Sequence, residues 1–262
     1  MRSLTRPWAA YDSEALWKQL WFQCGCAAGK DLRFGVIYFP GTWSDTDCHY
    51  AVHHVLGQPA EHIWHRETDL SGYDCLILPG GFSYGDYLRA GAIARFSPVM
   101  NSVERFAQNG GLVIGICNGF QILCESRLLP GSLITNNHLQ YRCEWVHLKV
   151  ENASLPFTSR STRGQVLHIP ISHYDGSYYA DPATVQELER TNRIVFRYCG
   201  PDGEVSDRTN PNGSLNNIAG IVNEGGNVLG MMPHPERVCE DLLGGTDGNV
   251  IFGSLIDSLA RR

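Results

Sequence analysis

The chain has 262 residues, of which 43% are hydrophobic, and this is enough to enclose one substantial core. Its net charge of -6 and the lack of a clustered basic face argue against a nucleic-acid partner, and its apolar runs are too short to span a bilayer. The nine cysteines are odd in number and scattered, without a Cys-x-x-Cys pair of metal-binding spacing. We therefore expect a cytoplasmic protein with reduced thiols and no structural metal.

The first segment, residues 1–31, carries many aromatic side chains, including Trp8, Trp17 and Trp21. Charged residues between them interrupt the continuous apolar core that a signal peptide needs. We expect a non-catalytic extension, either a short amphipathic helix that packs on this chain or a partner, or a disordered segment. The main domain would then comprise residues 32–262.

The first half of this domain alternates apolar runs with helical patterns. Strands are predicted near Phe34–Tyr38, His62–His65, Cys75–Leu78 and Leu112–Ile116, and the clearest helices at Asp45–Leu56 and Pro98–Gln108. Such alternation predicts an α/β fold with helices on both faces of a parallel sheet. Open sheets of this kind bind their ligands at the carboxyl ends of the strands.

The second half of the domain contains further extended segments. The predicted strands are Tyr141–Val150, Gln165–Ile169, Ile194–Tyr198, Ile218–Val222 and Asn227–Met232, and the predicted helices are Pro182–Asn192 and Asn249–Ala260. We expect the first four of these strands to fold over one end of the sheet.

A single cysteine lies between two glycines in the run Gly-Ile-Cys117-Asn-Gly, where an apolar strand should turn into a helix. Flanking glycines let the backbone crowd and strain, and a helix N-terminus offers free N–H groups and a partial positive charge. Both features favour a thiolate, so Cys117 is a candidate nucleophile. The motif alone fits a buried structural cysteine equally well, because cysteine is among the most often buried residues.

A histidine and a carboxylate follow the last predicted strand in the run Pro-His234-Pro-Glu236-Arg. A nucleophilic cysteine needs an imidazole within hydrogen-bond reach and a third group that fixes the tautomer and the charge of that imidazole. His234 and Glu236 can supply both, and the flanking prolines stiffen the segment. The alternative is a strand-end turn with a solvated histidine.

A glycine-rich loop follows the strand Cys75–Leu78 in the run Leu-Pro-Gly80-Gly81-Phe. Acyl transfer develops negative charge on the carbonyl oxygen, and backbone N–H groups can stabilise that charge. A donor from this loop, opposite the N–H of Asn118, would complete an oxyanion hole. A lone Pro-Gly-Gly could equally be a simple turn.

Taken in this order, the three segments resemble those of the class I, or triad, glutamine amidotransferases. Longer runs narrow the resemblance to the glutaminase subunits of phosphoribosylformylglycinamidine synthase, from about Leu32 nearly to the C-terminus. These runs are Leu78 to Pro98, Cys117 to Leu123, Asn210 to Ser214, Asn217 to Ile221 and Gly230 to Arg237. The resemblance implies an amidotransferase domain at 32–262 with a flavodoxin-like open parallel sheet, helices on both faces and additional β-strands in its C-terminal half.

The resemblance also implies a reaction, the hydrolysis of glutamine to glutamate and ammonia through a glutamyl thioester. Cys117 would be the nucleophile, His234 the general acid and base, and Glu236 the carboxylate that orients the imidazole. The backbone N–H groups of Gly81 and Asn118 would hold the oxyanion.

Further positions match those that related enzymes use around the substrate, namely Gly80, Gln121 and His173. His173 lies in a turn and could be structural or face the substrate. In many relatives a glycine follows this histidine, whereas this chain has Tyr174.

The partners follow from the same resemblance. Ammonia would pass to a separate ATP-dependent synthetase subunit that makes formylglycinamidine ribonucleotide in purine biosynthesis, and the resemblance allows a small accessory subunit. No Walker loop is visible in this chain, so ATP and magnesium are expected on the synthetase subunit. No cofactor is expected here.

Two other classes of function stay open. The chain could be a stand-alone cysteine hydrolase of γ-glutamyl substrates, although protease-like relatives usually lack the His-x-Glu pair. It could also be a catalytically silent binding subunit, although silent homologues usually lose the nucleophile. Release of glutamate from glutamine by the purified chain would separate these alternatives from a glutaminase.

Overall fold

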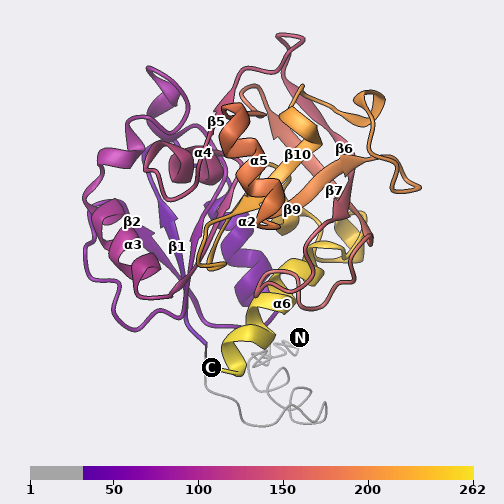
Figure 1. Cartoon of the computed structure of the whole chain (residues 1–262). Helices are drawn as coiled ribbons and strands as arrows, with labels where there is room; N and C mark the ends of the chain where they lie inside the picture. Colours follow the sequence, from indigo (N-terminus) through magenta and orange to yellow (C-terminus); the bar gives the residue numbers. More distant parts are fainter. Residues whose placement is uncertain (1–31) are drawn as a thin grey trace, which may run out of the picture. The chain divides into compact units, whose positions relative to one another are not determined.

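The computed structural model describes residues 32–262, and the expected extension at residues 1–31 lies outside the described residues. A nine-stranded sheet runs through the described part, and helices pack against it (Figure 1). Its two halves differ in strand direction.

The first half of the sheet consists of parallel strands in the order β2-β1-β3-β4-β11. Their bounds are Phe34–Tyr38 for β1, Ala60–Trp64 for β2, Cys75–Leu78 for β3, Leu112–Ile116 for β4 and Val228–Met231 for β11. The order of the first four is typical of flavodoxin-like sheets. The predicted bounds of β1, β3 and β4 are confirmed, and β2 begins two residues before its predicted start.

The second half of the sheet is antiparallel and continues from β11 in the order β10-β9-β6-β7. These strands are β10 (Ile218–Val222), β9 (Ile194–Cys199), β6 (Arg142–Val150) and β7 (Val166–His173), while β5 (Ser132–Ile134) and β8 (Ser177–Tyr179) form a separate pair. We predicted that the strands now labelled β6, β7, β9 and β10 fold over one end of the sheet. This prediction was wrong, because the four strands lie side by side with β11 and extend the same sheet. β10 is buried along its whole length, as expected for a strand with neighbours on both sides and covered faces.

The helices lie between the strands in the chain. The α-helices are α2 (Asp45–Tyr50), α3 (Pro98–Gln108), α4 (Asn118–Glu125), α5 (Pro182–Arg190) and α6 (Gly248–Ala260), with a π-helical turn at Ala51–Val55 and 3₁₀ turns at Ser83–Asp86, Ala94–Phe96, Asp207–Thr209, Leu215–Asn217, Pro235–Arg237 and Asp241–Leu243. The chain passes through α2 from β1 to β2, toward one edge of the sheet, and passes through α3 and α4 in the opposite direction, from β3 to β4 and on toward β11. Because crossovers between parallel strands are right-handed, α2 lies on one face of the sheet and α3 and α4 lie on the other. None of the described helices has the length and apolar content to cross a membrane.

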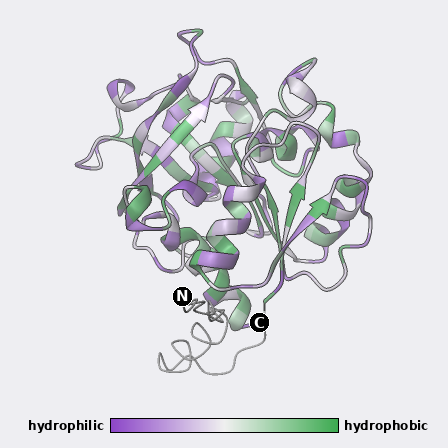
Figure 2. Cartoon of the chain, turned by 180° about the vertical axis from the view of Figure 1, so that it is seen from behind, coloured by the Kyte–Doolittle hydropathy of each residue, from purple (hydrophilic) through white to green (hydrophobic). Residues whose placement is uncertain are grey.

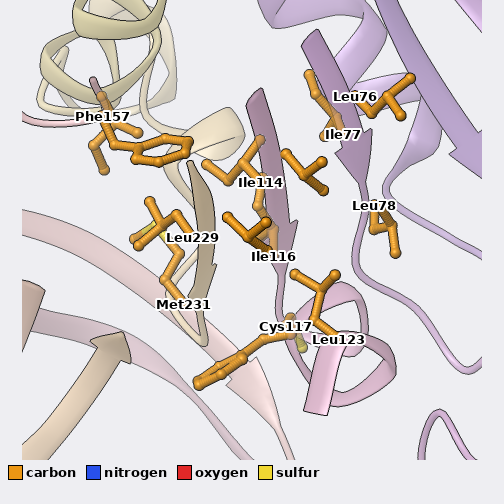
Figure 3. Close-up of a cluster of buried hydrophobic side chains, with 14 of the residues drawn as sticks. Leu76, Ile77, Leu78, Ile114, Ile116, Cys117, Leu123, Phe157, Leu229 and Met231 are labelled. Carbon is orange, nitrogen blue, oxygen red and sulfur yellow. The ribbon is translucent and has the colours of Figure 1, made fainter. Parts of the chain in front are cut away.

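The central strands form the hydrophobic core. They are the most consistently hydrophobic part of the sheet, whereas hydrophilic residues dominate many of the loops (Figure 2). Every residue of β3 and β4 is buried, and Figure 3 shows side chains such as Ile77, Ile114 and Leu229 gathered around these strands. Cys117 lies at the end of this cluster, so the core fixes the position of the residue that follows β4.

Candidate active site

Cys117 occupies a strained turn between β4 and α4. Its backbone has φ 51° and ψ -108°, a conformation that non-glycine residues rarely adopt. The Cys117 N–H donates to the Met231 carbonyl over 2.8 Å, which ties the turn to β11. A side chain at Gly119 would overlap the Leu78 carbonyl oxygen, so glycine lets α4 approach β3 closely. The sequence prediction of a strand, a sharp turn and a helix is confirmed.

His234 and Glu236 form a buried pair after β11. Their Nδ1 and Oε1 atoms are 2.6 Å apart, and each residue is 2% exposed. Burial alone would lower the pKa of His234, but the Glu236 carboxylate and the Cys117 sulfur outweigh it and raise that pKa above its ordinary value. Within residues 32–262, His234 Nε2 has no hydrogen-bond partner, so this nitrogen is free to act on a substrate or on the thiol.

The loop after β3 brings Gly80 against both groups. A Cβ atom at Gly80 would lie 2.7 Å from His234 Cε1 and 3.4 Å from the Cys117 Cβ. The Cys117 sulfur lies 3.6 Å from the carbonyl oxygen of Ser172, at the end of β7. The carboxyl ends of β3, β4 and β11 thus meet at one place, as the sequence predicted.

The predicted oxyanion donors are the backbone N–H groups of Asn118, which follows Cys117, and of Gly81, which follows Gly80. Gly81 has φ 143°, a backbone conformation that favours glycine. Asn118 is the first residue of α4, so its N–H has no acceptor within the helix. Both N–H groups are therefore candidates to bind an oxyanion.

The side chains of Asn118 and Gln121 belong to a buried network. Asn118 accepts from the Ser83 N–H over 3.2 Å and donates to Gln121 Oε1 over 2.8 Å and to Asp86 Oδ1 over 3.3 Å. Gln121 Nε2 in turn donates to the Asp175 carbonyl over 2.6 Å. Gln121 is 6% exposed and joins α4 to the segment after β7, so its predicted contact with substrate stays a prediction.

His173 is 3% exposed and packs against Gly176. Its Nε2 lies 3.0 Å from Asn212 Nδ2, and because that amide nitrogen can only donate, the Nε2 atom accepts and is unprotonated. Burial, with smaller effects from His234 and His138, lowers the pKa of His173 to about 3. The ring is therefore neutral, and a structural role for it has direct support, whereas substrate contact stays a prediction.

One side-chain contact in the site was missed from the sequence. Asn212 belongs to the run Asn210 to Ser214, which carried the family resemblance without a residue role, so a signal was present. Ser172 begins the segment Ser172 to Tyr178, which matches positions that related enzymes use around the substrate, and its contact with the Cys117 sulfur is through its backbone carbonyl.

A hollow of about 440 Å³, which Asp47, Glu236 and Arg237 help to line, reaches the acid–base pair of this site. Within residues 32–262, no group of three or more His, Cys, Asp or Glu side chains is arranged to hold a metal. A hollow of about 630 Å³ lies between the end of α4 and α5, lined in part by Arg127 and Arg193, and it includes none of the residues above. The convergence of reactive groups, and not volume, identifies the site.

Comparison with known proteins decides the family. The family described as CobB/CobQ-like glutamine amidotransferase domain matches residues 31–244. Phosphoribosylformylglycinamidine synthase subunit PurQ of Moorella thermoacetica is 62% identical over 226 residues, which cover 86% of this chain and 96% of that protein. The chain belongs to the PurQ family. The resemblance inferred from the motifs is therefore confirmed.

Solved structures agree with the PurQ family. A chain in the structure of PurLQS from Thermotoga maritima is 40% identical, with a TM-score of 0.78, and the match covers 88% of this chain and 100% of that one. A glutamine amidotransferase from Thermotoga maritima is 15% identical with a TM-score of 0.53, over 89% of this chain and 100% of that one. The second likeness shows the shared fold alone. The predicted class I glutamine amidotransferase fold is thus confirmed.

Proposed function

We propose that this PurQ-family chain is a glutaminase in which Cys117 attacks the side-chain amide of glutamine. The observation that carries the proposal is the convergence of Cys117, in a strained turn at a helix N-terminus, with the buried His234–Glu236 pair. A PurQ-family chain that kept the fold without the chemistry would have no need of these groups together. The raised pKa of His234 keeps a proton on the imidazole at neutral pH, so His234 can donate that proton during the reaction.

In the first half of the reaction, the Cys117 thiolate forms a bond to the amide carbon and the carbonyl oxygen becomes an oxyanion. The N–H groups of Gly81 and Asn118 bind that oxygen. The C–N bond then breaks while the His234 imidazolium gives its proton to the leaving nitrogen. The products are ammonia and a glutamyl thioester on Cys117, and His234 is left neutral.

In the second half, water attacks the thioester carbon. Neutral His234 takes a proton from this water, and the same two N–H groups bind the second oxyanion. The C–S bond breaks, the Cys117 thiolate returns and glutamate leaves. Glu236 holds the imidazole in one orientation throughout.

We further propose that the ammonia serves a separate ATP-dependent synthetase subunit, which makes formylglycinamidine ribonucleotide in purine biosynthesis. Support comes from the similarity to a chain in the PurLQS structure, whose name combines PurL, PurQ and PurS. The absence of a Walker loop in this sequence agrees with an ATP site on another subunit. ATP and magnesium then belong to the synthetase subunit, no cofactor is needed here, and a small accessory subunit completes the enzyme. This role in purine synthesis fits a cytoplasmic protein.

The test is glutamate release from glutamine by the assembled enzyme with Cys117→Ala. We expect glutamine-dependent turnover to be lost while ammonia-dependent synthesis continues, and Cys143→Ala, which removes an exposed thiol, to keep full activity. Glutaminase activity in Cys117→Ala would refute the assignment of the nucleophile. A wild-type chain that ignores glutamine but cleaves other γ-glutamyl substrates would make it a stand-alone hydrolase.

A further inference from the structure

Arg237 connects the histidine segment to the beginning of α2. The residue directly follows Glu236, and its Nη2 donates to Ser44 Oγ over 2.8 Å, while its Nε lies 3.4 Å from Asp47 Oδ2. Ser44 is 1% exposed, so the serine end of this contact is shielded from water. The guanidinium therefore joins the turn Pro235–Arg237 to the residue before α2.

Ser44 in turn holds the loop that carries the predicted oxyanion donor. The N–H groups of Trp43 and Ser44 both donate to the Gly80 carbonyl, over 3.1 and 3.0 Å. No peptide bond among residues 32–262 is cis, so the Gly81 N–H points opposite to the Gly80 carbonyl, away from these two residues. Whatever fixes the backbone at Ser44 therefore also fixes the direction of the Gly81 N–H.

Gly80 is confined from two sides. A Cβ atom there would lie 3.3 Å from Ser44 Oγ and 2.7 Å from His234 Cε1. The serine hydroxyl and the imidazole thus bound the same small space beside the glycine. A shift of Ser44 would change how the 80–81 peptide sits against the catalytic histidine.

We propose that Arg237 and Ser44 are positioning residues that hold the Gly80–Gly81 peptide with its N–H directed at the oxyanion. The inference rests on the proposed function, because it needs Gly81 as an oxyanion donor. Arg237 lies next in the chain to Glu236, so one side chain couples the acid–base half of the site to the oxyanion half. Neither positioning residue touches the substrate in this role.

This positional role differs from a purely electrostatic one. A positive charge beside Glu236 would act on the His234 proton, and lysine could replace arginine for that purpose. Spanning Ser44 and Asp47 together needs the planar, multi-donor guanidinium, which an ammonium group cannot reproduce. Arg237→Lys should therefore be impaired like Arg237→Met, although it keeps the charge.

The experiment uses the full chain assembled with its synthetase subunit, with Arg237→Met, Arg237→Lys, Ser44→Ala and the Arg237→Met/Ser44→Ala double variant. Removing one oxyanion donor outright costs about 10²–10³-fold in kcat, so loss of its support should cost about 10–100-fold with KM for glutamine nearly unchanged. Glutamate γ-semialdehyde, whose adduct with Cys117 carries an oxyanion, should lose affinity by the same factor. The kcat of the double variant should be no lower than that of the less active single variant, because both substitutions remove the same Arg237–Ser44 hydrogen bond.

Two controls separate positioning from other effects. Alkylation of Cys117 by iodoacetamide forms no oxyanion, so its rate and pH profile should stay those of the wild type in each variant. Arg160→Met removes another arginine, paired with Asp257 on α6, and should leave kcat unchanged.

The proposal is overturned if alkylation slows as much as kcat, if Arg237→Lys restores activity, or if the two single effects add. If Arg237→Met fails to fold, Ser44→Ala decides, because it removes only one hydroxyl group. A fully active Ser44→Ala, with Cys117→Ala inactive, would refute this positioning role and leave the proposed function standing. An active Cys117→Ala would refute the proposed function itself.

Discussion

Glu236 determines the protonation of His234. Burial disfavours an imidazolium, and the carboxylate 2.6 Å away offsets this cost. The folded chain holds this proton more tightly than the unfolded chain, whose histidine titrates near ~6.5. The stabilisation from this proton is therefore fully present below about pH 6.5 and is lost as pH rises through the higher folded-state pKa.

We predict that Glu236→Gln lowers kcat by about 10²–10⁴-fold, the range of general acid–base contributions. The amide cannot hold the imidazolium charge, so the pKa of His234 should fall and the thiolate should be lost at neutral pH. The pH profile of Cys117 alkylation measures this shift directly. Glu240→Gln, four residues further on, should keep the wild-type profile, and an unchanged profile in Glu236→Gln would contradict the assigned role.

Gly80 gives a second prediction at this scale. Gly80→Ala would place a methyl group 2.7 Å from the His234 ring, so the imidazole must move and glutaminase activity should fall at least ~10-fold while the chain stays folded. Gly110→Ala is the matched control, because nothing lies within 4 Å of its Cβ position. Its cost is backbone strain at φ 84°, which affects stability and not turnover. Wild-type turnover in Gly80→Ala would show that the loop does not crowd the histidine.

Residue by residue, the sequence predicted the reactive groups better than their supports. Cys117, His234 and Gly80 each follow an apolar strand, and the ends of parallel strands share one edge, so their meeting could be foreseen. Asn212 and Ser44 reach the site through contacts between segments far apart in the chain. Local patterns carry no information on such contacts.

At the scale of elements, Asn118 at the start of α4 is hydrogen-bonded to the turn Ser83–Asp86. In this arrangement the Asp86 carboxylate is partly buried. Burial, together with the nearby Asp175, raises the pKa of Asp86 to about 6, while its hydrogen bond with Asn118 acts in the opposite direction. The folded state thus binds this proton more tightly than the unfolded chain. Stability should fall as pH rises between about 4 and 6.

We predict that Asp86→Asn stabilises the chain above pH 6, by about 1 kcal/mol once screening of this partly exposed group is allowed for. The amide oxygen can still accept from Asn118, so this hydrogen bond is kept. Urea unfolding across this pH range measures the effect, which should vanish near pH 4. Asp69→Asn should have the opposite sign, because hydrogen bonds with Ser71 lower the pKa of Asp69. Equal stabilisation at every pH would contradict the titration of Asp86.

Elements were predicted best where burial is complete. The inner parallel strands β3 and β4 are buried along their whole length and gave continuous apolar runs, whose bounds matched the prediction. The edge strand β2 exposes Glu61 and His62, and its predicted start was two residues late. The four antiparallel strands of the main sheet were found, although β7 runs on to His173 and not to Ile169, and the short pair of β5 and β8 was missed. The pairing of the four strands was not predicted, because alternation shows which face is solvated and says nothing of the neighbouring strand. Their continuation of the main sheet places the end of β7 against Cys117.

At the scale of the whole molecule, we ask whether glutaminase activity depends on assembly with the synthetase subunit. A glutaminase that runs without an acceptor wastes glutamine, and the oxyanion loop is followed by an exposed surface that includes Phe82, Tyr87 and Leu88. We expect the synthetase subunit to reorder the Gly80–Gly81 loop into its active position, so that assembly raises the rate of the chemical step.

We therefore predict that the synthetase subunit, with ATP and formylglycinamide ribonucleotide, raises glutaminase kcat by about 10-fold or more, the typical scale of coupling between sites. Glutamate release with and without the partner measures this, and a free chain as fast as the assembled enzyme would refute it.

A second experiment shows whether assembly acts on glutamine binding or on the chemical step. If assembly tightens glutamine binding, glutamine must tighten assembly by the same factor, which the inactive Cys117→Ala variant can report. If assembly acts only on the oxyanion donors, kcat rises and the affinity of Cys117→Ala for its partner is indifferent to glutamine, because the transition state alone uses those donors.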